Sequence, residues 1–440
     1  MTGLFAPGSR RYLVSLALVI ACGAGPFRAA TAGAEGIYPI EYLVELVPGT
    51  DSALVTITVA NSALVRELDF NIGAGLYSEF ASDSPWRREG DRLLWEPEGD
   101  PARLSYRARI SQRRPSQHSD DAPRYDALMT SDWAIFRGDD LVPPAAVTTV
   151  PGARSDARLV FELPQGWPSV NTEWREEPLP GSAEEAGNRR VFRVDNPERR
   201  FDRPTGWMIA GKLGTRRDFL GAPDVGLTRV SVSAPKGTAL HRMDILTFLN
   251  FVWPAVQETL GKLPDELLIV GGDNPMWLGG LSAAHSLFLH AERPLVSENG
   301  TSALMHELTH MLTRISGKKR DDWIAEGIAE FYAIEFISRS GGMTAERKQR
   351  VLEALGEWGR EVNTLRKPHS TGATTARAVL LFYDLDREIR TLSGNRKSLD
   401  DVVRELMKQR KVGVGDLRRV VGELIARPSQ VLDSPLLDSA

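Results

Sequence analysis

The spacing of two histidines in residues 306–310, H-E-L-T-H, constrains this chain more than any other feature. If the segment is helical, His306 and His310 lie one turn apart on the same face and direct both imidazoles at a single ion. Glu307 is rotated by about 100° from His306, which places its carboxylate beside the ion rather than on it. From there it can accept a proton from a metal-bound water. The pattern therefore predicts a helix that carries a catalytic metal site.

A third metal ligand has to come from elsewhere, because a catalytic zinc usually has three protein ligands and an open water position. Glu326 supplies it if the chain turns back after Ile315. Gly317 and the charged run at residues 318–322 favour such a turn. Glu330 follows one helical turn later, where it can accept a hydrogen bond from the second ring nitrogen of a ligand histidine. The sequence thus predicts one Zn2+ per chain, held by His306, His310 and Glu326.

The composition is ordinary for a globular protein of two or three domains: 440 residues, 42% hydrophobic and 25% charged. The formal net charge is -4, and it becomes -7 once residues 1–34, with three arginines and no acid, are removed. This balance argues against a nucleic-acid partner. It also gives no electrostatic reason to expect an anionic membrane surface as a partner.

Residues 1–34 are typical of an export signal. Two arginines precede an apolar run at residues 12–21 that is too short to span a membrane, and small residues follow. Two processing routes are open: residues 19–22 fit a lipobox ending at Cys22, and residues 32–34 offer ordinary signal cleavage. The lipoprotein route is favoured, because an exported chain with a single cysteine cannot use it for an internal disulfide. We expect a periplasmic protein or an outer-membrane lipoprotein.

Alternation of apolar and polar residues with a period of two recurs between residues 37 and 233. Residues 55–59, 104–110 and 159–163 are clear examples, and turn residues separate such runs. Each run predicts a strand in a sheet with one buried face. We therefore expect a β-rich N-terminal domain over residues 35–234, with a β-sandwich or a related open sheet.

The pattern changes near Pro235, after which we expect a catalytic domain over residues 235–340 and a C-terminal helical region over residues 341–440. Residues 243–260 have helical periodicity, with Pro254 expected to kink this helix or break it in two. Short strands are expected near residues 267–270, 277–281 and 286–290. Further helices are expected at about residues 322–339, 344–360, 374–393, 398–409 and 414–426. The predicted fold class is a multidomain α+β protein.

A helix with H-E-x-x-H, a glutamate ligand on the next helix and strands before it is the pattern of thermolysin-like gluzincins. Residues 323–327, W-I-A-E-G, resemble the W-x-x-E-G element of zinc aminopeptidases. Within that group the chain most resembles the glycyl aminopeptidase family. Residues 279–281, G-G-L, are similar to the start of its G-G-L-E-H segment, and residues 385–403 look like its C-terminal helical signature. The resemblance implies a thermolysin-like domain behind a β-rich region, without the PDZ module of many members.

Two residues depart from that family. The glutamate of G-G-L-E-H, which the resemblance implies would bind a substrate's free amino terminus, is Ser282 here. The tyrosine expected to donate a hydrogen bond to the transition-state oxyanion aligns with Thr375. Loss of one such donor typically costs on the order of 10²–10³ in rate. The candidate substrate-binding residues that remain near the lost glutamate are Gly279, Gly280 and His285.

The favoured function is zinc-dependent hydrolysis of short or unfolded peptides in the bacterial envelope, with Glu307 as general base. Peptide or unfolded protein is the expected partner, and a lipid anchor at Cys22 would be the sole link to a membrane. The alternative is a catalytically weak or inactive zinc protein of the same fold that binds peptides or envelope partners. An intact Glu307 favours the enzyme, because a purely structural site has no need of it, whereas Ser282 and Thr375 favour the alternative.

Overall fold

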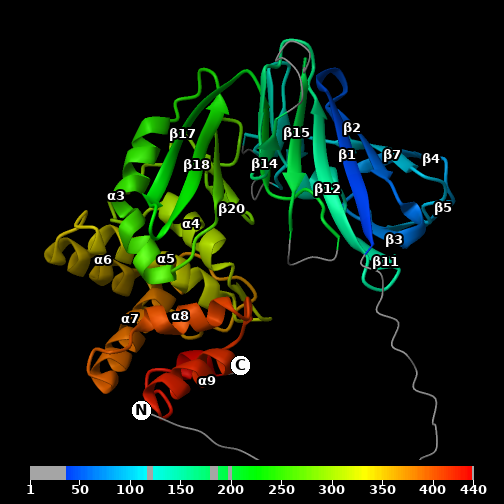
Figure 1. The fold of residues 1–440 in the computed structure, drawn as a ribbon. Helices are drawn as coiled ribbons and strands as arrows, with labels where there is room; N and C mark the ends of the chain where they lie inside the picture. Colours follow the sequence, from blue (N-terminus) through cyan, green and yellow to red (C-terminus); the bar gives the residue numbers. More distant parts are fainter. Residues whose placement is uncertain (1–35, 116–121, 179–186, 197–200, 439–440) are drawn as a thin grey trace, which may run out of the picture.

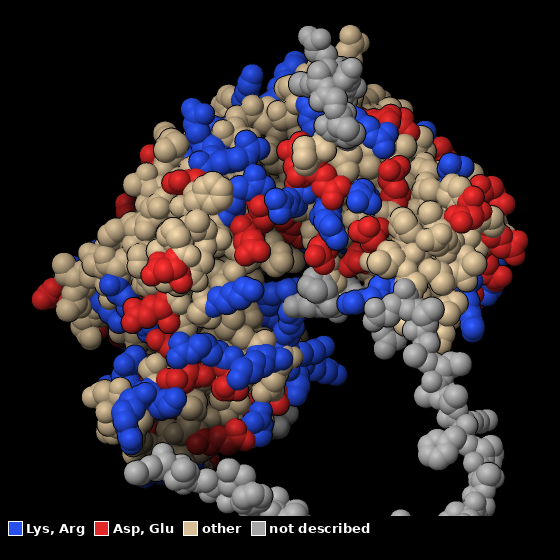
Figure 2. Space-filling model, viewed as in Figure 1, with Lys and Arg blue, Asp and Glu red and all other residues tan. Residues whose placement is uncertain are grey.

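The computed structural model describes residues 36–115, 122–178, 187–196 and 201–438. The expected export signal, with Cys22, lies outside the described residues. Figure 1 shows a β-rich part formed by the first half of the chain, beside a second part in which a sheet is followed by helices. Basic and acidic side chains lie interspersed over both parts on the face shown in Figure 2. Within the described ranges, no helix is both long enough and apolar enough to cross a bilayer.

In its described residues, the β-rich part contains sixteen strands and a short helix, α1 (Gly138–Leu141). The strands are β1 (Ile37–Val47), β2 (Ser52–Val59), β3 (Val65–Asn71), β4 (Tyr77–Ser82), β5 (Trp86–Glu89), β6 (Arg92–Trp95), β7 (Ala102–Arg109), β8 (Gln112–Arg113), β9 (Tyr125–Met129), β10 (Trp133–Arg137), β11 (Ala145–Thr149), β12 (Arg154–Glu162), β13 (Ser169–Asn171), β14 (Arg175–Glu177), β15 (Arg189–Val194) and β16 (Trp207–Gly211). They form sheets of seven, five and four strands, in the orders β14-β15-β12-β1-β2-β7-β4, β13-β16-β10-β9-β8 and β11-β3-β6-β5.

The alternation expected from the sequence buries one face of these strands. Val55, Ile57 and Val59 of β2 are buried, and the polar residues between them are partly exposed. They belong to one hydrophobic cluster with Phe70 of the four-stranded sheet and Phe136 of the five-stranded sheet. The sheets therefore enclose a common core, as a sandwich-like domain requires.

The second part begins with a five-stranded sheet in the order β17-β18-β19-β21-β20. Its strands are β17 (Leu213–Ala222), β18 (Gly226–Pro235), β19 (Glu266–Gly272), β20 (Gly280–Ser282) and β21 (Ser286–His290). Sheet membership thus divides the chain near residue 212, whereas the expected boundary lay at residues 234/235. Alternation shows that residues 213–235 are strands, but it does not say which sheet they join.

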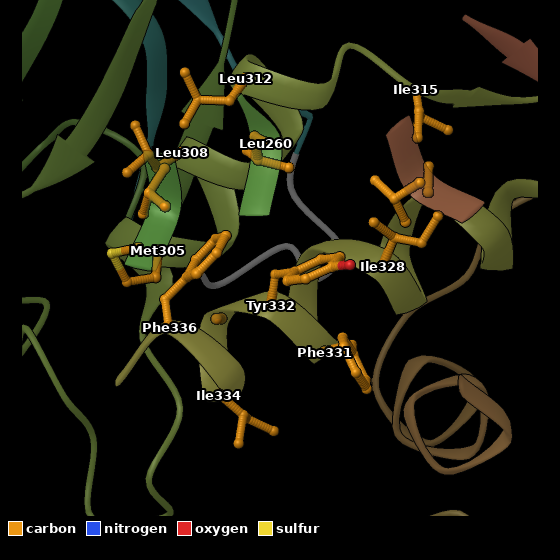
Figure 3. Packing of buried hydrophobic residues seen from close by; sticks show 14 of the residues in the cluster. Leu260, Met305, Leu308, Leu312, Ile315, Ile328, Phe331, Tyr332, Ile334 and Phe336 are labelled. Carbon is orange, nitrogen blue, oxygen red and sulfur yellow. The ribbon is translucent and has the colours of Figure 1, made fainter. Parts of the chain in front are cut away.

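A set of helices packs on this sheet and continues beyond it. Their bounds are α3 (Arg242–Leu260), α4 (Ala303–Thr313), α5 (Asp322–Arg339), α6 (Ala345–Trp358), α7 (Ala373–Ser393), α8 (Leu399–Met407) and α9 (Val414–Ile425). The expected helices end within a few residues of these bounds. Pro254 does not break α3, which continues through it as one helix. Figure 3 shows Met305, Leu308 and Leu312 of α4 packed with Tyr332 and Phe336 of α5, and this packing fixes the two helices relative to each other.

The two parts share a small apolar cluster of their own. Trp207 and Ile209 of β16 pack with Val270 of β19 and Phe288 of β21. The rings of Trp207 and Phe288 have their centroids 5.3 Å apart. The β-rich part therefore lies directly against the strands β19 and β21.

Candidate metal centre

Local sequence explains why residues 303–313 form a helix with its histidines at one side. The Ser302 hydroxyl caps the N-terminus by accepting a hydrogen bond from the Met305 backbone N–H at 3.2 Å. Leu304, Met305, Leu308, Met311 and Leu312 are buried in the core. His306, Glu307 and His310 occupy the remaining, partly exposed face.

The chain turns back after α4, as the sequence predicts. Residues Ser316–Gly317 form a short strand, β22, that pairs with β23 (Lys411–Val412). A Cβ atom on Gly317 would lie 2.5 Å from backbone atoms of Asp321, so the tight turn requires glycine here. This turn brings α5, with Glu326 and Glu330, alongside α4.

The three predicted ligands lie together. The two imidazole Nε2 atoms of His306 and His310 are 3.1 Å apart. Glu326 places Oε2 3.4 Å from the first and Oε1 3.3 Å from the second. Two ligand atoms about 2.0–2.1 Å from a tetrahedral ion are separated by about 3.3 Å. The three separations therefore fit a single zinc ion, and His306, His310 and Glu326 can hold one.

Glu330 fixes the orientation of one ligand. The Nδ1 atom of His306 lies 2.8 Å from Glu330 Oε2. Donation of a proton from Nδ1 leaves the Nε2 lone pair directed at the cluster, as a metal ligand requires. Burial lowers the pKa of His306, but hydrogen bonds to Glu326 and Glu330 outweigh this and raise it to about 10. Burial likewise raises the pKa of Glu326, and hydrogen bonds from both histidines lower it to about 2. The carboxylates of Glu326 and Glu330 thus favour a positive charge at this position, which a bound cation would also supply.

Strand β20 lies against Glu307. A Cβ atom on Gly280 would be 2.5 Å from Glu307 Cγ, so the strand touches the predicted base through a position without a side chain. Gly279 precedes it, and its carbonyl accepts the His290 backbone N–H at 3.0 Å. His285 lies in the turn after β20, where its backbone N–H donates to Glu173 at 2.9 Å. None of the three candidates is among the described residues that line the cavity beside His306 and Glu326. Of the three, Gly280 is the one whose contact with the predicted base the structure shows.

A cavity of about 560 Å3 opens beside the ligands. His306, Glu326, Glu330 and Thr375 line it, and so do the apolar side chains of Val351, Ala354, Leu355 and Trp358 from α6. Thr375 is in the first turn of α7, 3.2 Å through its hydroxyl from Ser370 Oγ. The aligned threonine therefore lines the same cavity as His306 and Glu326. Trp358 and Ser370 were not predicted, because no motif marks them.

No tyrosine is among the described residues that line this cavity. Of two tyrosines near the site in sequence, Tyr332 is buried in the helical core and Tyr383 is partly buried against it. The Tyr332 hydroxyl donates to Asp400 at 2.8 Å, and the Tyr383 hydroxyl donates to Glu335 at 2.7 Å. Neither phenol can therefore take the place of the tyrosine that Thr375 replaces.

No protein-family model matches the chain, and no curated protein matches its sequence. Solved structures do match. An M1 zinc metallopeptidase from Deinococcus radiodurans is 15% identical, with 92% of this chain and 93% of that chain covered and a TM-score of 0.58. An aminopeptidase N family protein from Idiomarina loihiensis is 15% identical, with 84% and 70% covered and a TM-score of 0.61. Legionella pneumophila aminopeptidase A, in complex with aspartic acid, is 13% identical, with 91% and 49% covered and a TM-score of 0.56. The chain therefore has the fold of the M1 zinc metallopeptidases.

Proposed function

We propose that the protein is a zinc-dependent peptidase that cleaves short or unfolded peptides. The observation that carries this proposal is the cluster of His306, His310 and Glu326, whose ligand atoms all lie within 4.8 Å of one another. Glu307 is on the same helix as the two histidines. A structural site has no use for a carboxylate at that position. The fold shared with zinc metallopeptidases supports the same conclusion.

Zinc bound there would polarise the scissile carbonyl and lower the pKa of the attacking water. Glu307 accepts the proton of that water and passes it to the leaving amine nitrogen. Glu330 keeps His306 in the tautomer that exposes Nε2 to the ion. Gly280 leaves the space that the carboxylate of Glu307 needs beside the substrate.

Strand β20 is the proposed binding edge for the substrate backbone. It is the outermost strand of its sheet and pairs only with β21 among the described strands, so an extended peptide can add to its free side. Its residue Ser282 provides no carboxylate for a substrate amino group. We therefore propose that the protein also cleaves internal bonds, with no strict requirement for a free N-terminus. A mutant of the Deinococcus enzyme has been solved with Tyr-Ser-Ala bound.

The cavity indicates which side chain the site accepts next to the cleaved bond. Its apolar wall is formed by α6, and Trp358 at the end of that helix is 60% exposed. An exposed tryptophan next to aliphatic side chains offers an aromatic face and an apolar surface. We propose a preference for bulky apolar or aromatic residues at this position.

A peptide library read by mass spectrometry, with and without a chelator, tests this function. Cleavage should depend on zinc, favour bulky apolar residues, and disappear in Glu307→Gln, which should retain its zinc because Glu307 does not bind the ion. His310→Ala should lose the zinc, because two ligands hold it poorly. Full zinc occupancy in His310→Ala, or cleavage that survives in Glu307→Gln, would contradict the proposed site.

A second function is supported by one observation. Thr375 lines the cavity without a nearby phenol, so the site lacks the oxyanion donor that the resemblance implies. A zinc protein that binds peptides and cleaves them weakly or not at all would show library peptides retained by the protein with no products. That outcome, with wild-type zinc content, would favour the binding protein over the peptidase.

We also propose that the protein acts outside the cytoplasm of a bacterium, as a periplasmic protein or an outer-membrane lipoprotein. The sequence pattern of residues 1–34 supports this. If Cys22 is acylated, Cys22→Ser should move the protein from the membrane fraction to the soluble fraction or leave it unprocessed. Unchanged fractionation with a mature chain that begins at Glu35 would instead indicate ordinary signal cleavage.

A further inference from the structure

A buried carboxyl group of the β-rich part reaches the second part of the chain. Glu173 lies between β13 and β14 and is only 3% exposed. Its Oε2 atom accepts hydrogen bonds from the backbone N–H of His285 at 2.9 Å and from the hydroxyl of Ser286 at 2.6 Å. The Thr205 hydroxyl donates to Oε1 at 3.2 Å. Glu173 thus bridges the β-rich part and the turn that joins β20 to β21.

The surrounding backbone leaves room for this carboxyl group. Gly206 has φ +81°, and a Cβ atom there would lie 2.0 Å from Glu173 Oε2. Burial raises the pKa of Glu173 to about 7. Removing this carboxyl group from water costs folding free energy that an apolar side chain at the same position would not cost. Within the β-rich part its only hydrogen-bond partner in the described residues is Thr205. The stronger contacts are all to the turn of the hairpin.

The same hairpin carries the strand next to the predicted base. Trp207 adds two contacts: its backbone N–H donates to Ser286 Oγ at 2.7 Å, and its indole N–H donates to the carbonyl of Leu281 at 2.9 Å. Leu281 is adjacent to Gly280, which touches Glu307. A continuous series of contacts therefore leads from Glu173 through the hairpin to Glu307.

We propose that Glu173 is a positioning residue for the active site: it holds the β20–β21 hairpin so that β20 stays against Glu307 and available to the substrate. This inference rests on the proposed peptidase function. Without the carboxyl group, the N–H of His285 and the hydroxyl of Ser286 lose their acceptor, and the hairpin is free to shift. A displacement of about 1 Å in a catalytic arrangement can lower the rate about 100-fold.

Three variants and a matched control test the proposal. Glu173→Ala removes the acceptor. Ser286→Ala removes one of its donors and, with it, the acceptor of the Trp207 backbone N–H. Glu173→Gln restores the contacts, because an amide oxygen can accept both bonds of Oε2 and the amide N–H2 can donate to Thr205. The control is Asp202→Ala, which removes a carboxylate of the β-rich part that accepts from Ser155 and Asn196 and does not touch the hairpin.

On a peptide that the wild type cleaves, Glu173→Ala should lower kcat/KM about 10- to 100-fold, with a raised KM as well as a lowered kcat. Ser286→Ala should also raise KM and lower kcat, because it breaks the contacts to Glu173 and to the Trp207 N–H. Glu173→Gln should retain most of the wild-type activity. A role in overall stability alone would lower the active fraction, and hence the apparent kcat, with KM unchanged. Wild-type kinetics in Glu173→Ala, or equal changes in Asp202→Ala, would overturn the proposal.

Hydrogen exchange gives a readout that does not depend on activity. Peptides that cover residues 280–290 should exchange faster in Glu173→Ala than in the wild type, while peptides from β1 and β2 should be unchanged. If the wild type cleaves no peptide but Glu173→Ala still exchanges faster at residues 280–290, the peptidase function is refuted and the hairpin contact is retained. Unchanged exchange at residues 280–290 in Glu173→Ala would refute the positioning role itself.

Discussion

Replacing Gly280 by alanine adds one methyl group at the point where β20 meets Glu307. The new Cβ atom would lie 2.5 Å from Glu307 Cγ, whereas carbon atoms in contact are about 3.5–4.0 Å apart. Either the strand or the glutamate must therefore withdraw by about 1 Å. A displacement of this size at a catalytic group lowers kcat about 100-fold, which corresponds to about 2.7 kcal/mol of transition-state stabilisation.

The assay compares Gly280→Ala with Gly415→Ala, a glycine near which a Cβ would meet no atom within 4 Å. Both proteins should contain one zinc per chain by mass spectrometry, because Glu307 does not bind the ion. Gly280→Ala should lose activity on a peptide that the wild type cleaves, and Gly415→Ala should not. A Gly280→Ala variant with wild-type kcat would show that the position of Glu307 beside β20 does not matter for the reaction. Loss of zinc in that variant would show that Glu307 supports the metal as well.

Three other substitutions have defined outcomes. Glu330→Ala should weaken zinc binding about 10- to 100-fold in a competition titration with a chelator, because His306 loses its 2.8 Å partner. Thr375→Tyr should raise kcat with little change in KM, because a new oxyanion donor lowers the activation free energy by at most about 3–4 kcal/mol. An unchanged kcat would show that the phenol is not aligned with the ion. Glu173 is more acidic in the unfolded chain, near 4.5, than in the folded protein, where burial raises its pKa to about 7. The stabilisation from its protonated form is therefore full below pH 4.5 and is lost as the pH rises through 7, which lowers the free energy of unfolding by up to about 3 kcal/mol. Glu173→Gln should remove this pH dependence from the free energy of unfolding measured in denaturant titrations.

The cluster of His306, His310 and Glu326 could be predicted because its geometry is local. The spacing of His306 and His310 determines their relation on a helix, and the turn at Gly317 makes the return of Glu326 expected. Helix bounds were also predictable, since caps and apolar periodicity act over a few residues. Pro254 was the exception: packing of α3 on the sheet keeps the helix continuous through it.

Contacts between distant parts of the chain could not be predicted from the sequence. Glu173 and Ser286 are 113 residues apart, and neither belongs to a motif. The assignment of β17 and β18 to the second sheet depends on parallel pairing of Val230 with Leu267, which alternation within a strand does not reveal. Trp358 joins the cavity because α6 packs on α7, which in turn packs on α5.

The apolar cluster between the two parts has a consequence for how this protein can be truncated or recombined. Residues such as Trp207, Val270 and Phe288 each contribute about 1.5–3 kcal/mol through burial, and a handful of them together approach the 5–15 kcal/mol that a whole domain has to spare. A fragment that starts at residue 212 would expose one side of this cluster to water and lack the partners of Ser286. Such a fragment should be prone to aggregation and poorly folded, even though all three predicted metal ligands are present. The half that contains the predicted metal ligands thus cannot be transferred on its own. Gene fusions or domain exchanges that replace the β-rich half must reproduce its contact face as well as its fold.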